Sequence, residues 1–456
     1  MDGNIATLLF SFAYVILSLV VWKFLEKVCD KYTARKILHM LVGNAVLIPV
    51  VLQADLWAAV LPSITFIVVT GEMVKRQVFE RGYNDAGLVL YPFSILLLTL
   101  MTYTTGNTNY MVIPTLILAY GDAVASLVGR NIFGKLRKSL EGSAAMFATS
   151  FTITYVISVL INGVSASLFW TFILAAVATW AERMRDDNLT VPLFTAIIIL
   201  LMNATPAGIA MGLGASLILS SFAFYLRALD LHGLIAGVVT GTALFAVSPA
   251  FFAVTVTFFF SSAVASLFRK KQKAVLKDFQ KTGKRNATQV LANGFPAVFG
   301  AAMHSAGINA VPFVIAAVAA ATADTWATEI GVLSRYRPRL ITNLARHVKR
   351  GRSGGVTALG LLASAVGGFT IFLAAWPFYG LAAFSPALIG AVVGSLLDSF
   401  FGATVQALYK CRICHKLTEK KKHCKVHSTL VQGQFWFDNN IVNLTSIMIA
   451  ATLVML

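Results

Sequence analysis

A carboxylate stands inside an apolar stretch of the chain, and a basic segment with several glycines follows it. The stretch from Tyr120 to Ser143 reads Y-G-D-A-V-A-S-L-V-G-R-N-I-F-G-K-L-R-K-S-L-E-G-S, and its carboxylate is Asp122. An ionised carboxylate in hydrocarbon costs roughly 2.5 to 3.5 kcal/mol even on a lenient scale, so it normally faces a cavity and has a partner. A functional role is therefore the first hypothesis for Asp122. The predicted partner charges are the basic residues that follow: Arg130, Lys135, Arg137 and Lys138.

Phosphate together with a divalent metal fits these residue types. Carboxylates suit Mg²⁺, basic side chains bind phosphate oxygens, and glycines let backbone amides approach a ligand. Residues 129–135 also spell G-x-x-x-x-G-K. Leu136, however, replaces the Ser or Thr of a P-loop, and the preceding segment is expected to be an apolar helix, so a true P-loop is excluded. Glu141 either caps the next helix or completes a metal site with Asp122.

The composition excludes a soluble globular protein. Of the 456 residues, 57% are hydrophobic and 12% are charged, and the mean hydropathy is +0.77. About 16 apolar runs of roughly 15 to 23 residues predict an all-α polytopic integral membrane protein with about 16 transmembrane helices. We expect two tandem helical units, residues 1–204 and 205–456, the second with a cytoplasmic Cys/His loop at 409–430.

The basic residues predict the topology. All 37 lysines and arginines fall in alternate loops between the apolar runs. Cytoplasmic loops carry an excess of Lys and Arg, so we place these loops in the cytoplasm and both termini outside. The first apolar run lacks a basic segment before it and indicates a membrane span, not a cleaved signal peptide. The net charge of +18 is then explained by the membrane topology, by attraction to anionic lipid headgroups and by phosphate binding. A nucleic-acid partner is disfavoured, because the basic residues lie in short loops and no soluble domain carries a groove.

Three motifs of the first half carry a family resemblance. They are R-K-I-L-H-M at Arg35 to Met40, the G-D-A-V-A-S-L-V-G-R stretch with its following G-K and K-S-L-E-G-S, and E-R-M-R-D-D-N-L-T-V-P-L at Glu182 to Leu193. Together they resemble the integral-membrane polyprenol kinases (phytol, farnesol and dolichol kinases), which are similar to the CDP-diacylglycerol synthases. The resemblance implies phosphorylation of a lipid alcohol with CTP and Mg²⁺.

The same resemblance implies roles for individual residues. Asp122 and Asp187 would be catalytic carboxylates and Mg²⁺ ligands, with Glu141 as a third ligand, and Arg130, Lys135 and Lys138 would bind the nucleotide. Alternative interpretations are snorkelling anchors at the second helix and a solvated acidic loop after the seventh span. Residues expected to support substrate or metal are Arg35, His39, Glu141, Glu182, Asp186 and Asn188.

The second half repeats the pattern of the first. Asp324 to Gly331 aligns with Asp122 to Gly129 as D-x-x-A-[S/T]-x-[I/V]-G, and D-N-N-I-V-N-L at Asp438 to Leu444 echoes D-D-N-L-T-V-P-L. From about residue 230 to 456 this half resembles the phytyl-phosphate kinase family. The segments that carry the resemblance are Lys284 to Gly294, Ala321 to Gly331, Pro338 to Thr342, Gly351 to Thr357 and Gly394 to Gln406.

Three acids in or beside apolar helices of this half predict a shared polar cavity: Asp324, Glu329 and Asp398. Asp324 and Glu329 are five residues apart, so they are offset around a helix and need not bind one ion. We expect Asp324 and Asp398 to be catalytic carboxylates and Mg²⁺ ligands. The expected phosphate ligands are Arg339, Lys349 and Arg352, with inside-positive anchors as the alternative; the expected supporting residues are Glu329, Asn293, Asp438 and Asn439.

The cysteines of the last loop predict a metal site. Cys411 and Cys414 form C-x-x-C, and Cys424 and His427 form C-x-x-H, within 17 residues. Three thiolates and one imidazole are a natural tetrahedral ligand set for structural Zn²⁺. The alternative is unpaired thiols in a basic loop, and Cys29 is incidental.

These features predict a bifunctional membrane kinase. The first half would convert an isoprenoid alcohol of the phytol, geranylgeraniol or farnesol type to its monophosphate, and the second would convert the monophosphate to the diphosphate. The partners are membrane lipids, both isoprenoid substrates and CTP or another nucleoside triphosphate, and a homo-oligomer is compatible with the sequence. Alternatives are a CTP-dependent cytidylyltransferase of a lipid phosphate and a two-repeat transporter, although the acids lie away from mid-membrane, where transport sites usually sit.

Overall fold

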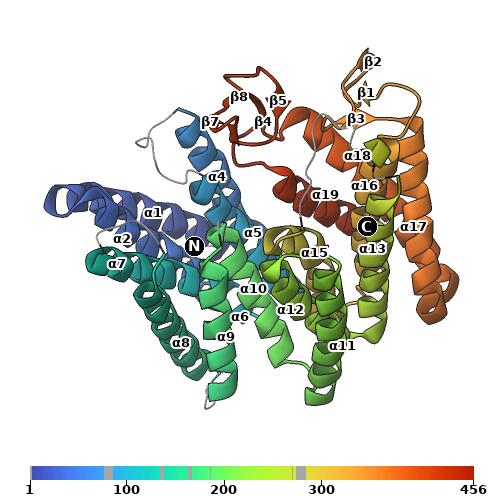
Figure 1. Ribbon diagram of the computed structural model, residues 1–456. Coiled ribbons are helices and arrows are strands. Elements are labelled where there is room, and N and C mark those ends of the chain that lie inside the picture. The colour runs from blue at the N-terminus through green and yellow to red at the C-terminus, as the bar shows by residue number, and fades with distance from the viewer. Residues whose placement is uncertain are drawn as a thin grey trace. The chain divides into compact units, whose positions relative to one another are not determined.

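The chain forms two helical units. The computed structural model describes residues 3–76, 86–133, 138–162, 167–184, 186–269, 271–273 and 284–456. Contacts divide the chain into Met1–Asn203 and Ala204–Leu456, and each unit is described by itself (Figure 1). The assignment of a separate activity to each part stays a prediction.

Helices are the only regular secondary structure in the described residues of the first unit. Helix α10 is its core, because it is buried along most of its length and packs against α5, α6 and α9. Helix α8 packs against α7 and α9. The elements are α1 (Gly3–Val28), α2 (Lys31–Gly43), η1 (Asn44–Val46), α3 (Leu47–Val51), α4 (Leu56–Lys75), α5 (Ala86–Thr105), α6 (Asn109–Leu116), η2 (Ile117–Gly121), α7 (Asp122–Phe133), α8 (Leu140–Asn162), α9 (Leu168–Glu182) and α10 (Asp187–Met202).

One π-helical turn, η2, interrupts the helix that carries Asp122. It joins α6 to α7 without a break, and Asp122 follows it directly. Such turns are rare and are found frequently at functional sites. The neighbouring helices approach η2 closely, because a Cβ placed on Gly43 of α2 would lie 2.4 Å from Ala119 and one on Gly121 would lie 2.6 Å from Met146. Glycine at these two positions therefore allows α2 and α8 to approach the turn.

In the second unit, helix α16 lies at the centre and packs against α13, α15, α17, α18 and α19. Small residues permit the closest of these contacts: a Cβ on Gly390 or Gly394 of α18 would lie 2.5 or 2.4 Å from Ala316 or Ala320 of α16. The helices are α11 (Pro206–Tyr225), α12 (Leu231–Val247), α13 (Pro249–Leu267), α15 (Ala287–Ser305), α16 (Val311–Gly331), α17 (Ala358–Tyr379), η3 (Gly380–Ala383), α18 (Phe384–Thr404) and α19 (Asn439–Leu453).

Short strands, which were not predicted from the sequence, fold two loops of this unit. They form antiparallel sheets of order β2-β1-β3 and β5-β4-β8 and a hairpin β6-β7. Figure 1 shows both sheets at the same end of α16, α17 and α18. The strands are β1 (Arg339–Leu340), β2 (Asn343–His347), β3 (Gly355–Val356), β4 (Leu408–Lys410), β5 (Leu417–Thr418), β6 (Lys422–His423), β7 (Val426–His427) and β8 (Thr429–Gln432).

The helices confirm the predicted fold class but not the predicted number of spans. Among the described residues, ten segments are long and apolar enough to cross a membrane, and one of them, Ala358–Thr404, contains both α17 and α18. Helices α9, α10, α12 and α19 are apolar but have only 15 to 17 residues. At 1.5 Å per residue such helices are shorter than a hydrocarbon layer of about 30 Å. The count of about 16 spans is therefore not confirmed.

Candidate functional site

Asp122 is buried and forms an ion pair with a lysine of another helix. Its side chain is 11% exposed, and its Oδ2 lies 2.6 Å from Nζ of Lys36 on α2, which is 18% exposed. The Ser126 hydroxyl, one turn further along α7, donates to Oδ1 at 3.3 Å. Of the four predicted partners of Asp122, Arg130 pairs with Asp30 and Lys138 with Glu182 and Asp187 instead, whereas Lys135 and Arg137 lie outside the described residues. The close packing of α2 on η2 brings Lys36 to the carboxylate instead.

Two further acids complete a carboxylate cluster with Asp122. Carboxylate oxygens of Asp122, Glu182 and Asp187 all lie within 4.8 Å of one another. Lys138 bridges the other two acids, since its Nζ lies 3.4 Å from Glu182 Oε1 and 3.1 Å from Asp187 Oδ2. It also donates to the carbonyls of Glu182 and Met184. The end of α9 and the start of α10 thus place two acids beside the acid that follows η2.

A cavity of about 380 Å³ is lined by two acids of this cluster, Asp122 and Asp187. Most of its wall is apolar and comes from α1, α2, α4 and α5, with side chains such as Val15, Phe66 and Ile95. Lys36, which pairs with Asp122, and Asn188, which donates to Asp187, also line it, together with His39. The cavity can therefore hold an apolar chain whose polar head lies against the carboxylates.

The other residues predicted for the first site take different positions. Arg35 and His39 line the cavity, and His39 stacks on Tyr91 with ring centroids 4.3 Å apart. Asn188 donates from Nδ2 to Asp187 Oδ1 at 3.1 Å. Asp186 is the residue preceding α10, and its carbonyl accepts from the N–H groups of Leu189 and Thr190 in the first turn of that helix. Glu141 is outside the carboxylate cluster, and Lys135 lies outside the described residues.

Arg130 of α7 forms an ion pair with Asp30, which lies between α1 and α2. Its guanidinium also lies 4.9 Å over the ring of Tyr32. The Arg130 and Thr33 side chains hold the pKa of the Asp30 carboxyl well below its usual range. Asp30 also caps α2 by accepting from the N–H groups of Tyr32 and Thr33. Arg130 therefore holds the first turn of α2, the helix that presents Lys36, to α7.

Replacing Lys36 by Met should destabilise the first unit by about 3–5 kcal/mol, because it leaves Asp122 as an uncompensated buried charge. Thermal unfolding in detergent measures the effect. The double variant Lys36→Met/Asp122→Asn should recover most of the loss. Lys75→Met is the matched control, since Lys75 pairs with Glu72 at 3.5 Å with its side chain 64% exposed, and such pairs contribute about 0–1 kcal/mol. Equal effects of the two single variants would contradict the buried pair.

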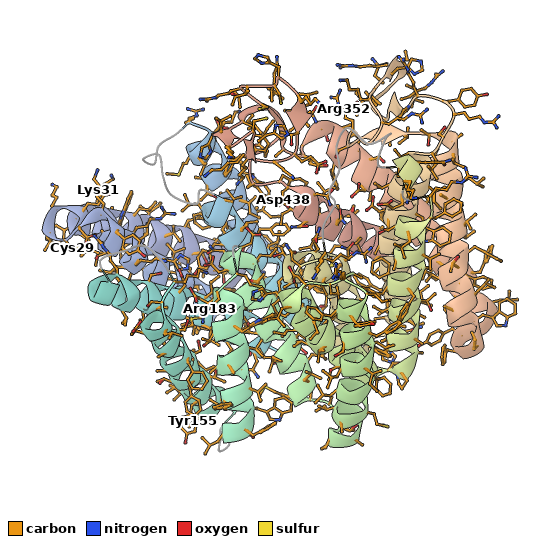
Figure 2. The ribbon with its side chains drawn as sticks, viewed as in Figure 1. Cys29, Lys31, Tyr155, Arg183, Arg352 and Asp438 are labelled. Atoms are coloured by element: carbon orange, nitrogen blue, oxygen red, sulfur yellow. The ribbon has the colours of Figure 1, made fainter. Side chains whose placement is uncertain are left out.

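The second unit contains a polar cavity of about 270 Å³ that gathers most of the predicted residues. Asp324, Glu329 and Asp398 line it from α16 and α18, and Asn293 and Asn439 line it from α15 and α19. Residues 351–357, which we call the glycine loop, also line it and include Arg352. Figure 2 shows Arg352 at the end of the unit where the sheets lie. One cavity thus joins residues that are far apart in the sequence.

An amide network adjoins Asp398. Asn443 of α19 lies 3.2 Å from Asp398 Oδ2, 3.2 Å from Asn293 Oδ1 and 3.1 Å from Asn439 Nδ2. Asp438, which was predicted to support the site, instead caps α19 by accepting from the N–H groups of Asn440 and Ile441. Asn443 was missed, although the motif D-N-N-I-V-N-L contains it.

Two cations of the loop before α15 also reach this region, and no site was predicted there. Lys273 forms an ion pair with Glu329 at 2.8 Å and is almost fully buried. Arg285 lines the cavity, and burial lowers the pKa of its guanidinium. Because arginine still remains protonated, a half-buried positive charge lines the cavity. A phosphate group is the ligand that would compensate it.

Two of the predicted phosphate ligands do not line this cavity. Arg339 on β1 donates to the carbonyl of Leu344, and Lys349 is exposed in the following loop. Strand β1 pairs with β2 on one side and with β3 of the glycine-rich segment 351–357 on the other, yet neither the Arg339 nor the Lys349 side chain lines the cavity. Arg352 lines the cavity and donates to Gln432 Oε1 at 3.2 Å.

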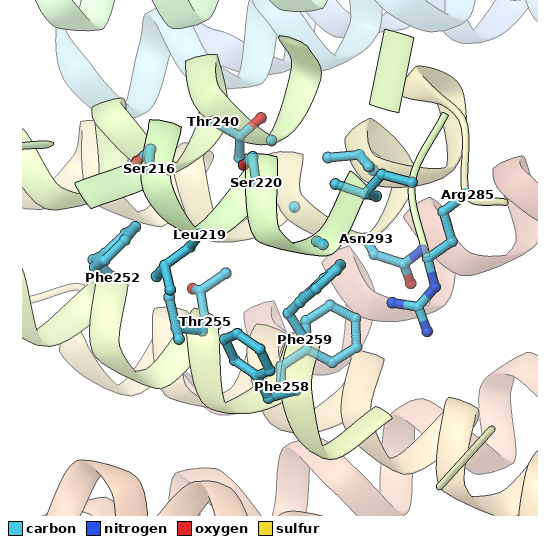
Figure 3. Close-up of a pocket in the computed structure, with 18 of the residues that line it drawn as sticks. Ser216, Leu219, Ser220, Thr240, Phe252, Thr255, Phe258, Phe259, Arg285 and Asn293 are labelled. Carbon is cyan, nitrogen blue, oxygen red and sulfur yellow. The ribbon is translucent and has the colours of Figure 1, made fainter. Parts of the chain in front are cut away.

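An apolar cavity of about 110 Å³ adjoins the polar one. It is formed by α11, α12, α13 and α15, and it shares Phe258, Arg285, Gln289 and Asn293 with the polar cavity. Figure 3 shows Arg285 and Asn293 at one end and Phe252 at the other. The second unit therefore repeats the arrangement of the first, with an apolar cavity that meets polar groups at one end.

Three of the four predicted zinc ligands lie together in the structure, and a different histidine joins them. Cys411, Cys414 and Cys424 gather with His423, and the four ligand atoms lie within 4.8 Å of one another. His427 is not in this group. In the β6–β7 hairpin, Lys422 pairs with His427 and His423 with Val426, so the two histidines point to opposite faces. Sequence spacing alone does not distinguish these faces.

Comparison with known proteins decides the family. A family model described as "Integral membrane protein DUF92" matches residues 214–451, just over half of the chain. The chain belongs to the DUF92 family. Membership confirms a multi-pass integral membrane protein, whereas the sidedness of loops and termini stays a prediction. The DUF92 match covers the polar cavity, the adjoining apolar cavity and the cysteine cluster.

Relatives of the DUF92 chain include two named proteins. Protein PGR of Arabidopsis thaliana is 32% identical over 257 residues, which cover 50% of this chain and 88% of PGR. Phytol kinase of a Synechocystis strain is 29% identical over 179 residues, 36% of this chain and 76% of that protein. An uncharacterized membrane protein of Methanocaldococcus jannaschii is 33% identical over 151 residues, 33% of this chain and 60% of that protein. No solved structure matches.

Proposed function

We propose that this DUF92 protein is a bifunctional isoprenoid kinase. The first unit would phosphorylate an isoprenoid alcohol, and the second would phosphorylate the resulting monophosphate to the diphosphate. The observation that carries the proposal is similar in both units: an apolar cavity adjoins a group of carboxylates and cations. Similarity to a phytol kinase supports this class of substrate.

In the first unit, the isoprenoid tail would lie along the apolar wall of the cavity. The hydroxyl group of the alcohol would lie beside Asp187 and Asp122. The hydroxyl oxygen would attack the γ-phosphorus of CTP or another nucleoside triphosphate. The bond from that phosphorus to the β,γ-bridging oxygen breaks, and the nucleoside diphosphate leaves. Asp187 would accept the hydroxyl proton, because it lines the cavity and is oriented by Lys138 and Asn188. Lys36 and Lys138 would bind phosphate oxygens.

The donor set of the first site suits Mg²⁺. Asp122, Glu182 and Asp187 offer only carboxylate oxygens, within 4.8 Å of one another, and hard cations prefer such ligands. Bound Mg²⁺ would neutralise charge on the triphosphate during transfer. With Lys36 and Lys138 counted, these side chains carry three negative and two positive charges, so a divalent cation is not repelled.

In the second unit, the nucleophile would be a phosphate monoester oxygen, which is already ionised and needs no general base. It would attack the γ-phosphorus and again release the nucleoside diphosphate. Arg285 and Arg352, with the backbone amides of 351–355, would bind the phosphates, and Asp324 and Asp398 would hold Mg²⁺. The tail would occupy the apolar cavity that shares Arg285 and Asn293 with this site (Figure 3).

Filling the apolar cavity should select against long tails. Thr255→Phe places a ring among the lining residues. KM for a C20 monophosphate should therefore rise about tenfold or more, because each buried CH₂ contributes about 0.8 kcal/mol. KM for a short-chain monophosphate should rise much less. Steady-state kinetics with monophosphates of increasing length measure the effect. Thr257→Phe is the control, because Thr257 lies on the same helix outside the lining. An equal loss for all tail lengths would contradict a tail site.

The decisive experiment supplies the purified protein in detergent with Mg²⁺, CTP or ATP, and phytol or geranylgeraniol. Mass spectrometry then identifies the lipid products and the released nucleotide. Monophosphate and diphosphate together with CDP or ADP are expected. A CDP-linked lipid with pyrophosphate, formed from a lipid phosphate, would indicate a cytidylyltransferase instead. No turnover of any lipid would contradict the proposal.

A further inference from the structure

The cysteine cluster of the second unit lies outside both catalytic cavities. Cys411 follows β4, Cys414 precedes β5, and His423 and Cys424 lie at the tip of the β6–β7 hairpin. All three cysteines are free thiols. The Nδ1 atom of His423 lies 3.4 Å from Sγ of Cys414 and 3.3 Å from Sγ of Cys424. The cluster therefore joins two turns that the strands alone do not connect.

We propose that these four residues bind one structural Zn²⁺ and that the ion fastens the strands β4–β8 over the phosphate cavity. Tetrahedral zinc with Zn–S of about 2.3 Å and Zn–N of about 2.05 Å separates sulfur from nitrogen by about 3.6 Å. The two sulfur to nitrogen distances are close to this value. Four protein ligands leave no open position, which is typical of a structural site.

The hairpin turn supplies an independent argument. Its two central residues, Cys424 and Lys425, have φ of 48° and 62°, a left-handed conformation that two-residue hairpins normally reserve for Asn and Gly. Non-glycine residues persist there only where their surroundings hold them. A metal bond to Cys424 would do so. Three thiolates and Zn²⁺ carry one net negative charge, which the neighbouring lysines at 420–422 and 425 balance.

The strands β4–β8 also contact the glycine loop of the cavity. Glu419 accepts from the Ser353 hydroxyl and lines the cavity. Gln432 accepts from Arg352 at 3.2 Å and donates to the carbonyl of Gly402 at 3.3 Å. Glu419 lies between Cys414 and His423 in the sequence, and Gln432 follows Cys424 on β8. Loss of the ion should therefore loosen the glycine loop without any change in the catalytic acids.

The first test is the metal content of protein purified in detergent without chelators. Elemental analysis should find about one zinc per chain. His423→Ala and Cys424→Ser should lose at least about 90% of it, while His427→Ala and Cys29→Ser, the matched controls, should keep it. Zinc kept by His423→Ala and lost by His427→Ala would overturn the ligand set. Iron in place of zinc, or a mapped disulfide among these cysteines, would overturn the metal assignment.

The second test does not require any variant to fold. Cobalt exchanged into the wild-type protein should give the intense visible absorption of a tetrahedral thiolate site. Removal of zinc by a chelator should speed amide hydrogen exchange in residues 351–355 and 417–432 and leave α16 unchanged. Absence of the cobalt spectrum would contradict the site, and unchanged exchange would contradict the fastening role. Neither readout depends on kinase activity, so the proposed function is tested separately.

Discussion

Asp122→Asn should stop phosphorylation of the isoprenoid alcohol and leave turnover of its monophosphate intact. The change removes the charge of a buried carboxylate that lies 2.6 Å from Lys36 and within 4.8 Å of two other acids. Loss of one preorganised electrostatic group commonly costs 10² to 10³ in rate, so a fall of about this size or larger is expected in kcat. Product formation from phytol and from phytyl monophosphate, measured in parallel, checks the prediction.

The control for this variant is Asp55→Asn. Asp55 is an exposed acid of the same unit, and its contact with Asn4 does not involve the cavity. It should retain both activities. If Asp122→Asn retained alcohol phosphorylation, the site assignment would be wrong. If it lost monophosphate turnover as well, the division of labour between the units would be wrong.

The helices could be predicted because each apolar segment in lipid must satisfy its own backbone hydrogen bonds. The runs near 110–129 and 309–332 accordingly coincide with α6 to α7 and with α16. Hydropathy does not reveal whether a short helix crosses the membrane, which is why the span count was not confirmed. It also does not reveal the π-helical turn η2, whose residues are as apolar as those of the helices beside it.

The sequence predicted which acids line the cavities, but it predicted less well which side chains contact those acids. Asp122, Asp324 and Asp398 were found because acids in apolar runs are costly. Lys36 stands 86 residues from Asp122, and only the packing of α2 against η2 brings them together. The position of Asn443 beside Asp398 depends in the same way on how α19 packs against its neighbours. For His423 and His427, the register of a short hairpin decides which side chain faces the cysteines.

The two units place different cations beside the carboxylates of their cavities. In the first, Lys36 and Lys138 contact the carboxylates directly. In the second, Lys273 pairs with Glu329, while Arg285 and Arg352 face the cavity. This difference fits the proposed substrates, because a monophosphate brings two more negative charges than an alcohol and needs arginine forks to bind them. The loose sequence repeat thus corresponds to similar cavities with different charge.

Asp324→Asn should make the isoprenyl monophosphate accumulate, because the first unit would still form it while the second could not use it. Asp324 lines the polar cavity with Asp398, and loss of one such charge should lower diphosphate formation about 10²-fold or more. Asp230→Asn is the control: Asp230 caps α12 by accepting from Gly233 at 2.7 Å, and Asn caps about as well. Continued diphosphate formation in Asp324→Asn would contradict a site at this cavity.

Mixing the Asp122→Asn and Asp324→Asn proteins gives the sharpest test of two separate sites. Monophosphate made by Asp324→Asn can diffuse to the intact second unit of Asp122→Asn, so the mixture should form diphosphate from the alcohol. Its rate should fall on dilution in detergent, whereas the wild-type rate per molecule should fall less, because tethering raises the effective concentration of the intermediate. A mixture as inactive as either variant would indicate that both acids serve one reaction.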